Sequence, residues 1–142
     1  MVLVKYKQSI SSGMVVTPSK RCTSVDMFNI YGAEGDNETG CSVGGFEITS
    51  TGYLVAINSK VQGSDSNVRN IYLCYADKSG TTAVSERLTY YTDKSVSTPQ
   101  LIKIDETNFI VMWAYDGRVQ YCKVDNKGKP TSEIFTIDGY LS

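Results

Sequence analysis

The sequence contains the same short pattern twice, and this repetition restricts the possible folds more than any other feature. The stretch ITSTGYLVAI at 48–57 matches IDETNFIVMW at 104–113, so that Val55 corresponds to Val111. The phrases LCYADKSG and YCKVDNKG then follow, each with a cysteine three residues before Asp-x-x-Gly. Both copies of the first pattern are apolar on both faces, as expected for a strand with a sheet packed on either side. Repeats of about 45 to 55 residues with four strands each are typical of β-propeller blades.

Short apolar runs of strand length recur along the whole chain, and no stretch keeps the apolar period of a helix. The 10 tyrosines, 12 glycines and only 3 prolines also favour an all-β protein. The Asp116-Gly117 dipeptide predicts a tight hairpin, and each Asp-x-x-Gly predicts a type I turn closed by a glycine with positive φ. We expect strands at 2–6, 23–31, 42–49, 53–60, 69–77, 83–91, 99–105, 109–115, 118–125 and 132–138.

These strands predict a single β-propeller-like domain over 1–142, with about two and a half four-stranded antiparallel blades. A partial blade occupies 1–41, a complete blade 42–96 and a second complete blade 97–142. Closed propellers need about four to eight blades. We therefore expect a fragment of a longer protein or a partial propeller that assembles with itself. Its partners are then other blades of the parent protein or copies of the chain.

Charge and composition argue against several classes of function. The 14 Lys and Arg residues nearly balance the 15 Asp and Glu residues, which argues against nucleic-acid binding and against a polybasic membrane contact. The chain has no histidine, so a Ser-His-Asp or Cys-His mechanism within it is excluded. Its apolar runs are far shorter than a membrane span, and its start lacks the apolar region of a signal peptide. An export signal would therefore lie upstream.

Part of the chain resembles a known group of repeats. The stretch STPQLIKIDETNFIVMWAYDGRVQYCKVDNKG, preceded by NIYLCYADKSGTTAVSERLTYYTD, is similar to repeats in uncharacterised secreted or cell-surface β-propeller proteins of Gram-positive, Clostridia-like gut bacteria. The similarity spans 41–138 and implies a propeller exported to the cell surface or the medium. The first complete blade departs from it, with SVGGFEI where the second has STPQLIKI. No catalytic residue is carried over, because neither a sialidase-type Asp box nor a Trp-Asp dipeptide is present.

The four cysteines, Cys22, Cys41, Cys74 and Cys122, form no Cys-x-x-Cys pair, which argues against a zinc site. Cys74 and Cys122 occupy corresponding positions in neighbouring blades. Packed sheets lie about 10 Å apart, whereas a disulfide needs Cα atoms within about 7 Å. We therefore predict that these two are not bonded to each other and are small buried side chains. A disulfide between Cys22 and Cys41 remains an open alternative.

The carboxylates are interpreted mainly as turn formers. Asp105 and Glu106 are an adjacent pair within a predicted hairpin, and neighbours in a turn rarely converge on one substrate. Asp77 and Asp125 are expected to accept hydrogen bonds from the backbone amides of their turns. The acidic loop at 32–40 offers oxygen ligands for calcium, but its spacing differs from an EF-hand, so a solvated loop is favoured. We predict no metal and no cofactor.

Aromatic side chains are the best candidates for ligand contact, because exposed rings stack on sugar faces and support protein interfaces. Trp113 corresponds to Ile57 in the other blade, which favours a role in the core or between blades. Tyr31, Tyr91 and Tyr115 are predicted to lie at the surface and are the candidate ligand-binding residues.

These features predict a non-catalytic binding module of an exported bacterial protein, with a glycan or another protein as its ligand. One rival hypothesis is a part of a propeller-fold enzyme acting on glycosides, with catalytic carboxylates near the propeller centre. A second rival is a structural spacer at the cell surface. The expected location is extracellular or at the cell surface.

Overall fold

The computed structural model describes residues 2–6, 22–26, 41–61 and 64–141. Within these ranges the chain forms ten strands and no helix, which confirms the predicted all-β class. The first sheet has the order β3 (Cys41–Ile48), β4 (Gly52–Ser59), β5 (Asn70–Asp77) and β6 (Ala83–Arg87). The second sheet has the order β7 (Gln100–Lys103), β8 (Asn108–Tyr115), β9 (Arg118–Asp125) and β10 (Phe135–Ile137). An N-terminal hairpin pairs β1 (Val2–Tyr6) with β2 (Cys22–Asp26).

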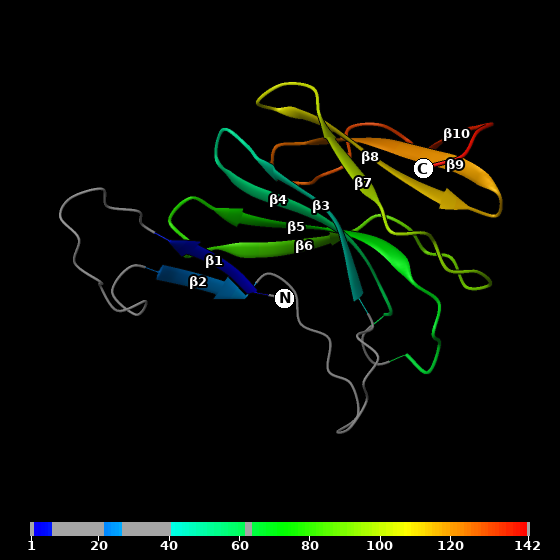
Figure 1. Ribbon diagram of the computed structural model, residues 1–142, viewed down its shortest axis with the longest axis horizontal. Coiled ribbons are helices and arrows are strands. Elements are labelled where there is room, and N and C mark those ends of the chain that lie inside the picture. The colour runs from blue at the N-terminus through cyan, green and yellow to red at the C-terminus, as the bar shows by residue number, and fades with distance from the viewer. Residues whose placement is uncertain (1, 7–21, 27–40, 62–63, 142) are drawn as a thin grey trace, which may run out of the picture.

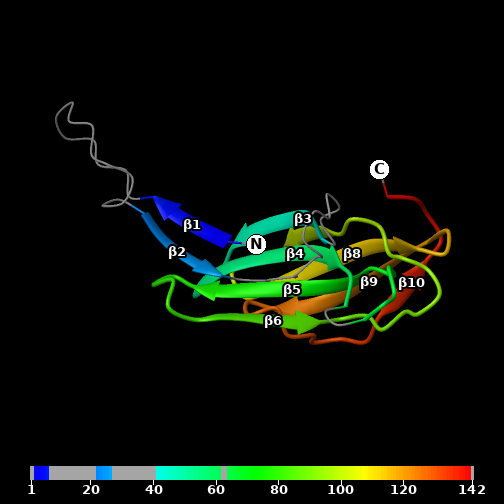
Figure 2. The same cartoon turned by 90° about the horizontal axis from the view of Figure 1, so that it is seen from below.

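Both four-stranded sheets are open antiparallel meanders in which each strand pairs with the next one along the chain. Figure 2 shows the strands of the two sheets running in the same order, from β3 to β6 and from β8 to β10. The first sheet is joined to the second by the segment 88–99, which returns the chain from β6 to the start of β7.

Each of the ten predicted strands has a counterpart among the described residues, but those predicted at 83–91, 99–105 and 132–138 are shorter than expected. Residues 27–31 of the strand predicted at 23–31 lie outside the described residues. The strand predicted at 83–91 ends at Arg87. One more backbone bond follows, from the Leu88 amide to the Ile71 carbonyl (2.9 Å), and side chains then replace the ladder. The backbone amide of Ile71 donates to the Thr89 hydroxyl (2.9 Å), which in turn donates to the Asn70 side-chain oxygen (2.9 Å). The strand predicted at 132–138 is reduced to β10, and the Lys123 amide donates to the Ser132 hydroxyl (2.9 Å) ahead of it.

The predicted turns are confirmed. Asp116 and Gly117 have φ angles of 49° and 76°, the positive values that a type I′ hairpin requires. Gly80 and Gly128 close the two Asp-x-x-Gly turns with φ angles of 72° and 80°. These turn residues determine where β5, β8 and β9 end and where β6 and β9 begin.

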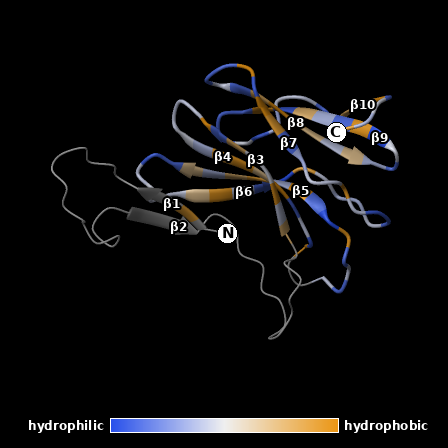
Figure 3. Cartoon of the chain, viewed as in Figure 1, coloured by the Kyte–Doolittle hydropathy of each residue, from blue (hydrophilic) through white to orange (hydrophobic). Residues whose placement is uncertain are grey.

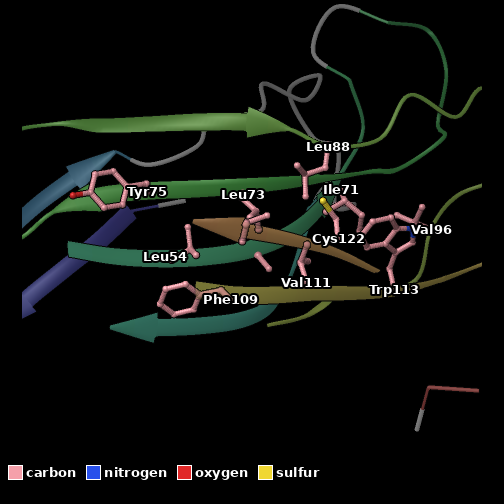
Figure 4. Packing of buried hydrophobic residues seen from close by; sticks show 12 residues of the cluster. Leu54, Ile71, Leu73, Tyr75, Leu88, Val96, Phe109, Val111, Trp113 and Cys122 are labelled. Atoms are coloured by element: carbon pink, nitrogen blue, oxygen red, sulfur yellow. The ribbon is translucent and has the colours of Figure 1, made fainter. Parts of the chain in front are cut away.

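The main core lies between the two sheets. Trp113 has no exposed surface, so its predicted role in the core is confirmed. Each fully buried valine, leucine, isoleucine or phenylalanine side chain in this core contributes about 1.5–3 kcal/mol relative to an exposed one. Figure 4 shows side chains from both sheets meeting in this layer. The contacting strand residues are Leu54, Ala56, Ile71, Leu73 and Tyr75 from the first sheet, and Phe109, Val111, Trp113, Cys122 and Val124 from the second.

A smaller cluster covers the opposite face of the first sheet. It contains Val55, Ile57, Tyr72, Cys74 and Ala76, with Leu3 of the N-terminal hairpin packed against it. β4 is therefore buried on both faces, as its apolar sequence predicts, and so is β5. The same prediction is wrong for β8, which is buried only on the face toward the first sheet. Figure 3 shows the hydrophobic residues concentrated on the strands and the hydrophilic residues in the turns at the sheet ends.

The sheets lie closest together at their first strands, β3 and β7. A methyl carbon placed on Gly44 would lie 1.8 Å from the Pro99 carbonyl oxygen, and one on Gly45 would lie 2.5 Å from the Leu101 Cβ atom. Lys103 also donates from its ammonium group to the Ile48 carbonyl (2.9 Å). Only residues without a side chain fit at this crossing, so the two glycines permit the contact.

Candidate functional site

The candidate site lies where β8 turns into β9 and where the segment 88–99 crosses between the sheets. The structure brings together two of the three predicted ligand contacts, Tyr91 and Tyr115. Their rings are stacked, with centroids 3.7 Å apart and planes inclined by 12°. Both side chains are half-buried, and they are called the tyrosine pair below. Tyr31, the third predicted contact, lies outside the described residues.

The backbone at Tyr91 is fixed by the side chain of Asn70, which is completely buried at the start of β5. The Asn70 amide nitrogen donates to the Tyr91 carbonyl (3.1 Å), and the Asn70 side-chain oxygen accepts from the Tyr91 amide (2.8 Å). This pair of bonds imitates a strand ladder where the chain has left the sheet. A buried amide with all its partners in place holds the segment in one position.

The side chain of Tyr91 is fixed by Gln120 on β9. The Tyr91 hydroxyl and the Trp113 indole N–H both donate to the Gln120 side-chain oxygen, the indole at 3.0 Å. Gln120 therefore joins the buried tryptophan to the ring that reaches the surface. The tyrosine pair is thus linked by hydrogen bonds to the core between the two sheets.

Charged groups surround the outer ring of the pair. The Tyr115 hydroxyl donates to the Asp93 carboxylate (2.6 Å), and Lys94 forms an ion pair with Asp116 in the β8–β9 turn. Asp93, Lys94 and Asp116 are exposed. The site therefore offers stacked aromatic carbon beside carboxylates and an ammonium group, a combination that suits hydroxylated ligands.

The protonation states also favour binding over proton transfer. The hydrogen bond to Asp93 raises the pKa of Tyr115 to about 12, and burial raises the pKa of Tyr91. The Tyr115 hydroxyl in turn lowers the pKa of Asp93. At neutral pH both phenols stay protonated as donors and the carboxylate stays charged. None of the three has the pKa near 7 that a general acid or base needs.

Tyr90 lies apart from the tyrosine pair, although it is next to Tyr91 in the sequence. The Arg87 guanidinium lies over the Tyr90 ring, 4.3 Å from its centroid. Arg87 also donates from Nε to the Thr89 carbonyl (2.8 Å). The Tyr90 ring is thus in contact with Arg87, the last residue of β6.

Sequence reasoning missed Asn70 and Gln120, the two amides that hold the pair. For Gln120 a signal was available. The two-residue turn at Asp116-Gly117 fixes the register of the hairpin, and that register places Gln120 opposite Trp113. No local pattern marks Asn70.

The carboxylates singled out in the sequence lie at the opposite end of the sheets, where they act in turns. Asp77 accepts from the Thr81 and Thr82 amides (2.9 and 3.1 Å), and Asp125 accepts from the Lys127 amide (2.8 Å). These contacts confirm the prediction that they cap backbone amides.

The adjacent pair of carboxylates, Asp105 and Glu106, is used in the same way. Asp105 accepts from the Thr107 and Asn108 amides, each at 2.8 Å. Glu106 forms an ion pair with Lys103 at 2.6 Å. The two carboxylates do not converge on a common point, so the predicted turn role is confirmed.

Cys74 and Cys122 are not bonded to each other, as predicted. Cys74 packs in the outer cluster of the first sheet, and Cys122 packs between the two sheets. Burial raises the pKa of both thiols, that of Cys74 to about 12. Both therefore act as packing residues rather than nucleophiles. The suggested bond between Cys22 and Cys41 is not tested, because the Cys22 side chain lies outside the described part of the chain, as does the acidic loop at 32–40. Cys41 itself is half-buried against the outer cluster, and burial raises the pKa of its thiol.

Two properties of the described residues bear on other functions. No group of three or more cysteine, aspartate or glutamate side chains there is arranged to hold a metal ion. The same residues include no helix that is long and apolar enough to cross a membrane.

Comparison with known proteins gives no match for this chain. No family model matches the sequence, and no curated protein or solved structure is significantly similar to it.

Proposed function

We propose that the chain is a non-catalytic binding module of propeller type, with a glycan or a protein as its ligand. The single observation that carries the binding function is the tyrosine pair, held in place by Asn70 and Gln120 where the two sheets meet. We further propose that the parent protein is exported by a bacterium and acts outside the cell or on its surface, as the resemblance of 41–138 to secreted propeller repeats implies.

The propeller interpretation is supported by the way corresponding residues pack. Val111 faces the first sheet, whereas its counterpart Val55 faces away from the second sheet, toward the N-terminal hairpin. Leu54 faces the second sheet, whereas its counterpart Ile110 points away from the first. The sheets are thus stacked in the same orientation, one behind the other, as neighbouring blades are. Two sheets of a symmetric sandwich would instead turn matching faces toward each other.

The close contact between β3 and β7 supports the same interpretation. In a propeller the first strand of each blade lines the central axis, where neighbouring blades crowd together. Figure 1 shows the sheets nearest at β3 and β7 and further apart toward β6 and β10. Gly44 and Gly45 are the residues that allow the close contact.

The site geometry supports binding because the tyrosine pair is preorganised. Ordering a flexible aromatic side chain at an interface costs about 0.5–1.5 kcal/mol, and the bonds to Gln120 and Asp93 remove much of that cost in advance. The stacked rings place apolar carbon beside the Asp93 carboxylate and the Lys94 ammonium group. Such a surface fits a sugar ring, which is apolar on its faces and polar around its rim.

The test is a glycan array probed with the labelled full chain, followed by titration of any bound glycan by calorimetry. Tyr115→Ala removes the outer ring of the pair and is expected to reduce affinity at least tenfold, and Tyr91→Ala is expected to do the same. Tyr115→Phe keeps the ring and loses only the bond to Asp93, so it is expected to keep most of the affinity.

Tyr140 provides a matched control, because its side chain is 96% exposed and lies outside the pair. Tyr140→Ala is expected to bind as the unmodified chain does. If Tyr91→Ala and Tyr115→Ala both keep full affinity for the glycan, the tyrosine pair is not the binding site.

A further inference from the structure

The second sheet exposes an apolar face on the side away from the first sheet. Cross-strand pairing places six partly exposed apolar side chains on it, with the buried Val119 opposite Ile137 and the exposed Lys123 opposite Ile110. The six are Ile102, Ile110, Met112, Tyr121, Phe135 and Ile137. Ile102 and Ile137 are 39% and 44% exposed, and the other four are half-buried. The Tyr121 and Phe135 rings are stacked with centroids 5.2 Å apart. This set is called the free face.

The chain itself indicates what such a face accepts. In the alignment of the two units, Ile110 corresponds to Leu54 and Tyr121 corresponds to Leu73. Leu54 and Leu73 are fully buried against the second sheet. The free face is therefore the counterpart of a surface that is already covered in the first sheet. What covers it there is the opposite face of a unit of the same kind.

The complementary surface is also exposed on this chain. It consists of Val43, Phe46 and Ile48 on β3, which are 58%, 50% and 54% exposed. They pair with Ile57, Val55 and Tyr53, so they lie on the face of the first sheet that points away from the second. This set is called the β3 flank.

One residue of the β3 flank has a direct precedent within the chain. Phe46 pairs with Val55, as Leu101 pairs with Val111, so Phe46 and Leu101 occupy corresponding positions. Leu101 packs against the first sheet. Phe46 is thus suited to pack against the free face in the same manner.

We infer that copies of this chain associate head to tail, with the free face of one copy against the β3 flank of the next. The contact joins two different surfaces, so it closes into a ring or extends into an open array according to the rotation between copies. This inference rests on sheet packing and needs no ligand at the tyrosine pair, so either proposal can fail without the other.

The contact is expected to be weak. On the outward face of the first sheet, the described residues of β4 and β5 are already covered, whereas Val43, Phe46 and Ile48 of β3 are exposed. Moreover, Gln100 stands on the free face where Gly45 stands in the first sheet, so the strands cannot approach as closely. A small contact of this kind has the character of a transient interface. We expect association at about 100 µM and a monomer at about 1 µM.

Sedimentation velocity of the full chain across this concentration range measures the association. Ile102→Lys places a charge on the free face, and Phe46→Lys places one on the β3 flank. Each variant alone is expected to stay monomeric. Mixed together they are expected to form a one-to-one dimer, because each keeps the surface that the other has lost. Val84→Lys is the matched control, since Val84 is 49% exposed on β6 and outside both surfaces, and it should associate normally.

Several results would overturn the inference. One is an unmodified chain that stays monomeric at the highest concentration. Another is a mixture of folded variants that fails to pair, or a Phe46→Lys variant that still associates, as a symmetric contact between two free faces would allow. Circular dichroism checks the folding of each variant. Should one unfold, Ile137→Lys and Ile48→Lys provide a second pair on the same two surfaces.

Discussion

Replacing Gly44 with alanine is expected to force apart the two strands at which the sheets lie closest. Neither Gly44 nor Gly45 has positive φ, so alanine fits the backbone at both positions. In the absence of a clash, such a change would stabilise the protein by about 0.4–1 kcal/mol, because it restricts the unfolded chain. Because β3 crosses β7 closely at these glycines, we expect the substitution to destabilise the protein instead.

The size of the clash follows from the geometry. The added methyl carbon would lie 1.8 Å from the Pro99 carbonyl oxygen, a backbone atom that cannot rotate away. Restoring an ordinary carbon–oxygen contact of about 3.3 Å requires the strands to separate by about 1.5 Å. A gap of about 0.5–1 Å already removes a quarter to a half of the dispersion attraction between facing atoms. We expect Gly44→Ala to lower the free energy of unfolding by about 3 kcal/mol, and Gly45→Ala by about 2 kcal/mol.

Equilibrium unfolding in urea, followed by the fluorescence of the single tryptophan, measures this change. Trp113 is buried between the sheets and reports on their separation. Gly117→Ala is the control, because nothing lies within 4 Å of the added methyl and its cost of about 1–2 kcal/mol comes only from positive φ. A Gly44→Ala variant as stable as the unmodified chain, or more stable, would show that β3 and β7 do not cross in this way.

Three further predictions concern the amide that holds Tyr91, the turn carboxylates and the buried thiols. Asn70→Ala is expected to lower the free energy of unfolding by about 3 kcal/mol, because it leaves several buried partners unpaired, and a loss below about 1 kcal/mol in urea unfolding would contradict that role. The pKa of Asp77 is lowered from 3.8 to about 2, chiefly by the Thr82 amide. Its contribution to stability is therefore complete above 3.8 and is lost as the pH falls toward 2, so Asp77→Asn should flatten the fall in melting temperature over that window. Cys74 and Cys122 are expected to react with a thiol reagent only at the rate of unfolding, and rapid labelling of either in the native state, located by mass spectrometry, would contradict their burial.

The strands and turns were predictable because their determinants are local. Alternating or continuous apolar runs mark the strands, and Asp116-Gly117 fixes both a turn and a register through two neighbouring φ angles. The same register places Trp113 opposite Gln120, on the same face of the second sheet. The repeated pattern predicted that β4 and β8 are both buried on two faces, and this holds for β4 but not for β8.

The close contact of the sheets and the early end of β6 could not be predicted in this way. Both depend on residues far apart in the sequence. In the sequence, Gly44 and Gly45 look like ordinary strand glycines. Their role becomes visible only in the structure, where Pro99 and Leu101 lie against them. Thr89 follows β6 in the sequence without a turn signal. Its hydroxyl donates to the buried Asn70 side chain, and this bond takes the place of strand pairing.

The site was predicted in part. Tyr91 and Tyr115 were expected at the surface as separate contacts, and the structure joins them in one stack. Their meeting depends on the path of the segment 88–99, which no local pattern specifies. Gln120 could have been assigned from the hairpin register, because it must lie opposite Trp113.

The stacking of the second sheet on the first is tested most directly by nuclear Overhauser contacts in the isotope-labelled full chain. The structure predicts cross-peaks between the β-protons of Leu101 and the α-protons of Gly45, two residues on different sheets. Leu101 contacts confined to its own neighbours on β8, with none to β3, would contradict the arrangement on which the fold, the site and the proposed assembly all depend.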